Sequence, residues 1–144
     1  MIKSFRGQIP HAGTEQIRLS TNDGLTGYKI KKFQLLQTDA NENVESTVKV
    51  FSIQPDPAVA VSGTLDFNDP TILAAAMYWA STAQADVHEN IVVFDNTVVN
   101  QDIFITHYDY GFAAAINYYI ELEQVKLDLN EATVATLKDM RGRE

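Results

Sequence analysis

The stretch over residues 116–142 constrains the fold most, because the longest strand pattern in the chain runs directly into the best helix pattern. Apolar and polar side chains alternate over residues 116–123, which is the period expected of a strand with one buried face. The apolar residues then change parity, to Val125 and Leu127. A strand cannot change parity without an extra residue or a change of sheet, so we expect a bulge or bend near Glu123–Gln124.

The same stretch ends in a helix predicted over residues 130–141. Asn130 is suited to cap its amino end, and Gly142 is suited to stop it. A helix of about three turns is marginal in water by itself, so its apolar stripe must be buried against something. The stripe could be buried in two ways: against an open end of its own domain, which we favour, or against a neighbouring subunit. In the second case the stripe forms an assembly helix, and its residues are Val134, Leu137 and Met140.

Strand patterns separated by Gly, Pro, Asn and Asp turns recur upstream, with no helical periodicity before residue 128. A second parity change predicts a bulge at Lys31–Lys32, with both lysines in solvent, inside a strand over residues 27–37. Residues 71–81 fit a helix or a strand that is apolar on both faces, and the all-β surroundings favour the strand. The other predicted strands cover residues 15–20, 46–54, 59–67, 91–94 (short and buried), 98–107 and 116–129.

These patterns predict an all-β fold: an antiparallel, jelly-roll-like β-sandwich of about eight strands with a short C-terminal helix. The 144 residues suit a single domain with one core. Residues 1–14 are expected to form an extended arm, because Gly7 and Pro10 interrupt weak strand character. Such an arm either packs on a neighbouring subunit or frays, and fraying is favoured.

Composition excludes several classes of function. The net charge of −8 argues against binding to nucleic acid and to anionic membranes. The chain has no cysteine, so disulfides, thiol nucleophiles and Cys-ligated zinc are ruled out. No apolar run approaches a membrane span, the amino end lacks the apolar segment of a signal peptide, and no phosphate-binding or nucleophile glycine motif occurs.

Few titratable residues suggest chemistry. His88 and His107 each lie near carboxylates, but no paired histidine spacing defines a metal site, and we expect His107 to be a hydrogen-bonded residue at a strand end. Glu121 and Glu123 share one strand face, an arrangement compatible with the acid–base pair of a glycosidase, but cross-strand ion pairs are favoured. We therefore assign no catalytic, cofactor-binding or metal-binding residues and expect a protein that is not an enzyme.

A turn rich in aromatic residues is the one candidate ligand or interaction surface. Its residues are Tyr108, Tyr110 and Phe112. Together with Trp79, these rings would supply a surface on which sugars can stack. This feature motivates an alternative function, a carbohydrate-binding β-sandwich module.

Three segments carry a family resemblance: Leu19–Tyr28, Asn100–His107 and Asn117–Asp139. They resemble a virion structural protein family of marine tailed phages and ocean-metagenome viruses, most strongly from Asn100 to Arg141. The resemblance implies a capsid decoration protein or a tail- or fibre-associated module, made in the host cytoplasm and located in the virion. It also implies a homo-oligomer that contacts other virion proteins, and it brings no catalytic residues. We take this non-enzymatic structural role as the leading expectation.

Overall fold

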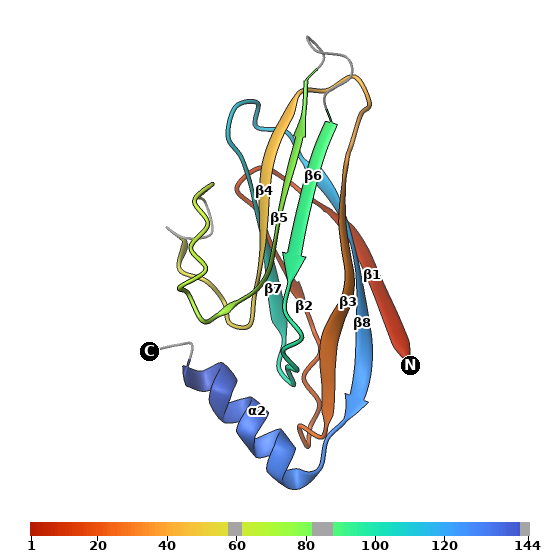
Figure 1. Ribbon diagram of the computed structural model, residues 1–144, viewed down its shortest axis with the longest axis vertical. Helices are drawn as coiled ribbons and strands as arrows, with labels where there is room; N and C mark the ends of the chain where they lie inside the picture. The colour runs from red at the N-terminus through yellow and green to blue at the C-terminus, as the bar shows by residue number, and fades with distance from the viewer. Residues whose placement is uncertain (58–61, 82–87, 142–144) are drawn as a thin grey trace.

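The computed structural model describes residues 1–57, 62–81 and 88–141, and it shows two antiparallel sheets packed face to face (Figure 1). One sheet has three strands in the order β1-β8-β3, and the other has five in the order β2-β7-β4-β5-β6. This order is jelly-roll-like and confirms the predicted β-sandwich with its C-terminal helix, α2 (Leu129–Arg141). The strands are β1 Ile2–Ile9, β2 Thr14–Ile17, β3 Thr26–Gln37, β4 Val44–Phe51, β5 Ile72–Ala80, β6 His88–Phe94, β7 Ile103–Asp109 and β8 Ile116–Lys126.

Alternation along β8 builds one wall of the core. Ile116, Ile120 and Leu122 are buried, while the intervening side chains face solvent on the outer side of the three-stranded sheet. On the opposite sheet, β5 contributes the small residues Ala74 and Ala76 to the same core cluster. Small side chains facing large ones let the two sheets interdigitate without voids.

The bulge predicted at Lys31–Lys32 is confirmed. The register of β3 against β8 shifts between Ile30 and Lys32, so Lys31 is the extra residue, and both lysines are exposed. Of the bulge or bend expected near Glu123–Gln124, the bulge is wrong, because the register of β8 is continuous there. Instead, the change of parity marks the point where the chain leaves the main core for a second cluster beneath α2, formed by Leu127, Ala132 and Ala135.

The amino end is not frayed. Ile2–Ile9 pairs with β8 over its full length, from Ile2 opposite Glu123 to Ile9 opposite Ile116. The strand remains at a sheet edge, and Ile9 is buried in the core. The backbone groups of this segment are hydrogen-bonded to β8 along the complete strand, and this pairing holds the amino end in place.

The strand predicted over residues 59–67 is wrong for the part that is described, because residues 62–67 form no strand. β4 already pairs with β5 and β7, so neither of its edges is free for a further strand. The segment instead covers the outer face of the five-stranded sheet. There the Lys49 ammonium, 1% exposed, donates to the Thr64 carbonyl at 3.0 Å.

Residues 71–81, which fitted either a helix or a strand, contain strand β5, so the favoured interpretation is confirmed. Its neighbour β6 corrects another prediction: residues 91–94 were expected to be a buried strand, yet β6 is the edge of the five-stranded sheet. Ile91 is 61% exposed and Val93 is 49% exposed. A run of apolar residues favours burial, but sequence alone does not show that no strand lies on its far side.

Helix α2 begins one residue before the predicted start. The Asp128 carboxylate accepts the Glu131 N–H at 2.7 Å, so Asp128 is the cap rather than Asn130. The predicted stop at Gly142 lies outside the described residues. No helix in the described ranges is long and apolar enough to cross a membrane.

The helix is docked on its own sandwich by Asn100, which is fully buried between α2 and the turn before β3. Its side-chain amide donates to the Thr136 hydroxyl at 2.8 Å, the Gly24 carbonyl at 3.1 Å and the Ala132 carbonyl at 3.2 Å. Ala132 and Ala135 face the sandwich, whereas Val134 and Leu137 are exposed. The helix therefore closes one end of its own domain and still presents an apolar stripe.

We predict that Asn100→Ala destabilises the protein and loosens α2. Loss of these buried bonds should lower the free energy of unfolding by about 1–3 kcal/mol, measured by chemical denaturation. Thr133→Ala is the matched control, since its hydroxyl bonds only within the exposed face of the helix. Equal stability of the two variants would contradict this account of helix docking.

Candidate functional site

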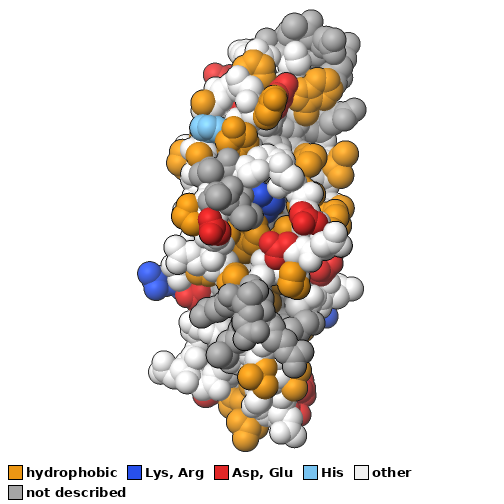
Figure 2. Space-filling model, turned by 90° about the vertical axis from the view of Figure 1, so that its left-hand side faces the viewer, with side chains coloured by type: hydrophobic (Ala, Val, Ile, Leu, Met, Phe, Trp, Pro, Cys, Tyr) orange, Lys and Arg blue, Asp and Glu red, His pale blue; other side chains and the backbone are white. Residues whose placement is uncertain are grey.

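The predicted aromatic surface is only partly assembled. Tyr108 lies on the outer face of β7, and Tyr110 follows the strand, with its backbone N–H bonded to the Glu45 carbonyl at 2.9 Å. The two rings line a hollow of about 470 Å³ together with Thr47 and residues 62–64. Figure 2 shows this side of the molecule, where hydrophobic side chains gather over the upper half.

The three rings differ in what they can contact. Tyr110 is 80% exposed, but Tyr108 is half-buried and packs against His11 with ring centroids 4.9 Å apart. Phe112 is exposed and lies outside the hollow, because its N–H bonds to the Asp109 carboxylate at 2.8 Å in the turn. The hollow therefore offers one freely accessible ring, Tyr110, rather than three.

A buried polar group beneath this turn resembles catalytic machinery in composition. Ser46 Oγ lies 2.7 Å from His107 Nε2 and 3.3 Å from Asp109 Oδ2, and all three side chains are buried. His107 Nδ1 lies 3.1 Å from the Ile9 carbonyl and 3.2 Å from the Pro10 carbonyl. Carbonyl oxygens only accept hydrogen bonds, so Nδ1 carries the proton and Nε2 accepts from Ser46.

This arrangement differs from that of a catalytic triad. In a triad the carboxylate bonds to the histidine nitrogen that faces away from the serine. Here the Asp109 carboxylate accepts the backbone N–H of Glu45 at 3.2 Å and lies 3.3 Å from the Ser46 hydroxyl, whose one proton goes to the nearer Nε2. His107 is fully buried, and its pKa is lowered by that burial despite the neighbouring carbonyls. The group ties β1, β4 and β7 together, and Ser46 is only 2% exposed.

The carboxylates of β8 are occupied by neighbours. Glu121 accepts the Tyr119 hydroxyl at 2.7 Å, and Glu123 pairs with Lys31 at 3.3 Å and Lys29 at 3.6 Å. The hydrogen bond from Lys31, helped by both lysine charges, holds the pKa of Glu123 below its ordinary value. A general acid needs a raised pKa, whereas the pKa of Glu123 is lowered. The ion pairs favoured from the sequence are therefore found at Glu123.

No cluster of metal ligands emerges from the described residues. Within them, no three His, Asp or Glu side chains converge in a way that could hold a metal ion. The side chain of His88, the other candidate histidine, lies outside the described part of the chain.

The predicted assembly helix presents two of its three residues to solvent. Val134 and Leu137 are exposed, and the side chain of Met140 lies outside the described part. Val134 also borders an apolar groove of about 430 Å³ between the helix and the sandwich, with Val98 and Val125. Helix and strand end therefore share one apolar surface.

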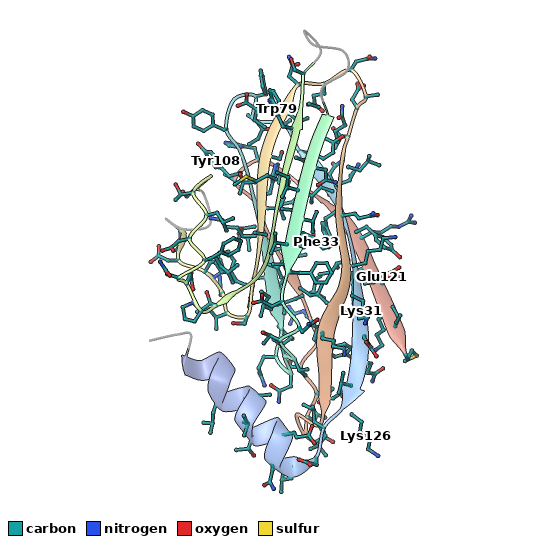
Figure 3. The ribbon with its side chains drawn as sticks, in the orientation of Figure 1. Lys31, Phe33, Trp79, Tyr108, Glu121 and Lys126 are labelled. Carbon is teal, nitrogen blue, oxygen red and sulfur yellow. The ribbon has the colours of Figure 1, made fainter. Side chains whose placement is uncertain are left out.

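The sequence reasoning missed a larger apolar surface on β5 and β6. Its residues, here called the edge patch, are Met77, Trp79, Ile91 and Val93, all exposed. Ile91 lies directly opposite Met77 in the ladder, so the patch is continuous across the two strands. Trp79 and Tyr108 lie in the upper part of the molecule, away from β1 and β8 (Figure 3). A sequence signal existed in the apolar odd-numbered residues of both strands, but apart from Trp79 these residues were assigned to buried faces.

Comparison with known proteins adds no assignment: no protein-family model matches the chain, and no curated protein matches it.

The buried histidine gives a prediction about pH. The folded-state pKa of His107 is lowered by burial, so the unfolded chain binds its proton more readily. Stability should therefore be complete above the unfolded-state value of about 6.5 and decline as the pH falls below it. The thermal unfolding temperature of the wild type should therefore fall between about pH 7 and pH 5, before most carboxylates titrate.

His107→Gln removes this titration. The variant should be less stable than the wild type at neutral pH, because a buried bonded ring is lost. Its stability should change less over the same acidic range, and a parallel decline in both proteins would show that another group is responsible.

Proposed function

We propose that this protein is a non-enzymatic structural component that assembles with copies of itself through the edge of β6. The observation that supports the proposal is the edge patch, which joins exposed apolar side chains to a strand that, among the described residues, pairs with a neighbour on one side only. Exposed apolar patches beside polar surface commonly mark interaction sites.

The backbone of β6 is arranged to accept another strand. Asp95 donates its N–H to the Leu73 carbonyl at 3.0 Å, in continuation of the β5–β6 register. Hydrogen-bonded and non-bonded residues alternate in an antiparallel pair, so Val93 and Ile91 direct their backbone groups towards β5. Val92 and Phe94 consequently direct theirs to the free edge.

The other three sheet edges are protected and β6 is not. β1 carries Lys3 and Arg6, β2 has only four residues, and β3 has three lysines and the bulge at Lys31. Charges, shortness and bulges are the devices that keep edges from pairing. β6 contains no Lys, Arg or Pro; its one carboxylate is Glu89, and it ends in the apolar run Ile91–Phe94. Such an edge favours pairing with a second copy.

Pairing of two β6 strands about a two-fold axis would join two five-stranded sheets into one continuous sheet. The edge patches of both copies would then lie side by side on one face. For the biological setting we propose a virion, with this homo-oligomer bound to other virion proteins. The sequence resemblance supports this setting, and jelly-roll sandwiches are common in viral capsids, which is an argument by analogy of fold.

The carbohydrate-binding alternative at Tyr108, Tyr110 and Phe112 has weaker support. Sugar stacking needs accessible ring faces, and His11 occupies the neighbourhood of Tyr108. Tyr110 alone offers an open face at that hollow.

Charges placed on the edge test the assembly proposal. Ile91→Lys and Val93→Lys should each weaken self-association by about a hundredfold or more, because an unpaired ammonium would be buried between copies. Light scattering and sedimentation over a range of protein concentrations measure this effect. Both positions are exposed, so the variants should keep the wild-type circular dichroism spectrum.

Val134→Lys and Leu137→Lys are the matched controls on the apolar stripe of α2. They should leave self-association unchanged. A wild-type protein that stays monomeric at high concentration would contradict the proposal, and loss of association only in the helix variants would transfer the interface to α2. The virion setting is tested separately by mass spectrometry of purified particles.

A further inference from the structure

The outer face of the three-stranded sheet carries a second candidate site that neither the resemblance nor the edge patch explains. Strand register places Arg6 and Gln34 on either side of Tyr119, in one row across the sheet. The next row holds Gln8, Asn117 and Leu36. These six residues line a hollow of about 760 Å³, within the range of small-ligand sites.

The chemistry of the hollow suits a sugar. Gln8, Gln34 and Asn117 contribute amides, each of which can donate to one hydroxyl and accept from another. Gln8 already donates to Asn117 at 3.3 Å, so two of these amides are aligned with each other. The Tyr119 ring is held by its hydrogen bond to Glu121, and a fixed aromatic ring can stack on the apolar face of a pyranose.

Charge narrows the class of sugar. β1, β3 and β8 together carry six Lys or Arg residues and two Glu residues. The chain has 11 basic and 19 acidic residues, so the remainder holds only five basic residues against seventeen acidic ones. Lys31, Glu121 and Lys126 lie along this sheet, on the opposite side from Trp79 and Tyr108 (Figure 3). An anionic ligand would be repelled elsewhere and attracted here.

The charges are not arranged for a nucleic acid. A phosphate chain needs a continuous track of available cations. Lys29 and Lys31 are paired with Glu123, and Glu121 lies in the middle of the face. Arg6 is the cation that lines the hollow, with Lys32 near the Tyr119 ring at 6.0 Å from its centroid. One or two local cations among amides suit separated acidic groups on a polyhydroxylated chain.

We infer that this hollow binds an oligosaccharide that carries carboxylate or sulfate groups. Arg6 contacts the acidic group, the amides of Gln8, Gln34 and Asn117 bond to hydroxyls, and Tyr119 stacks on a ring. Most of its lining comes from the three-stranded sheet, and Asn90 of β6 also lines it, so the hollow extends towards the proposed assembly edge.

Calorimetric titration of the full chain at low salt tests the inference, with four probes: oligogalacturonate, heparin-derived oligosaccharides, neutral dextran oligosaccharides and a single-stranded oligonucleotide. At least one acidic sugar should bind more tightly than dextran and the oligonucleotide. Whether the carboxylated or the sulfated sugar binds identifies the acidic group.

Variants then assign the residues. Arg6→Gln should weaken acidic-sugar binding by about tenfold or more, since a charge-assisted hydrogen bond is lost. Lys126→Gln makes the same change of charge on the same sheet outside the hollow and should change binding by about twofold or less. Tyr119→Ala should weaken binding, and Tyr119→Phe should weaken it less, because the ring remains but its bond to Glu121 is lost. Tyr110→Ala, in the turn after β7, should have no effect.

Three results would overturn the inference: no binding of either acidic sugar, equal losses for Arg6→Gln and Lys126→Gln, or equally tight binding of the oligonucleotide. None of the substituted side chains is buried, and denaturation curves verify that each variant is folded. Light scattering on Arg6→Gln shows whether self-association persists, so failure of this site is distinguishable from failure of the assembly proposal.

Discussion

Both neighbours of β8 take their register from it, β1 on one side and β3 on the other, and its apolar face forms one wall of the core. A slip of one residue would turn Ile116, Ile120 and Leu122 towards solvent and their polar neighbours inward. The bulge at Lys31 exists for the same reason. Tyr28 and Ile30 precede it on one parity, Phe33 and Leu35 follow on the other, and the extra residue lets both pairs face the core.

The opposite wall depends on polar groups that satisfy one another. Ser46, His107 and Asp109 are buried where β4 and β7 meet the turn after β1, and each makes hydrogen bonds there. Buried polar groups cost free energy unless they are bonded, so this network specifies how the N-terminal turn sits against the five-stranded sheet. Residue types that suggest catalysis in a sequence therefore act here as structural links.

The outer faces of the two sheets have different chemistry. The five-stranded sheet is partly covered by residues 62–67 and ends in the apolar edge patch, whereas the three-stranded sheet is basic, rich in amides and hollowed around Tyr119. One domain thus offers a surface suited to its own copies and another suited to an acidic ligand. The hollow includes Asn90 of β6, so the two surfaces lie next to each other along that strand.

Errors in the predictions share a cause. The apolar run Ile91–Phe94 was assigned to the core, and residues 59–67 to a strand, because local pattern does not state how many neighbours a strand has. Asn130 was chosen as the helix cap, but Asp128 reaches the Glu131 N–H, and both residue types are good caps. In each case several local solutions were acceptable, and packing selected one of them.

The sequence by itself determined the alternation of β8, the bulge at Lys31–Lys32, the terminal helix and the β-sandwich class, because all of these follow from the order of apolar and polar side chains along a few residues. Only the tertiary structure decided that β6 is an edge, that His107 meets Ser46, and that Arg6, Gln34 and Tyr119 share one row. These features depend on which distant strands pair and in what register, and that choice is made by the free energy of the complete core rather than by any local pattern.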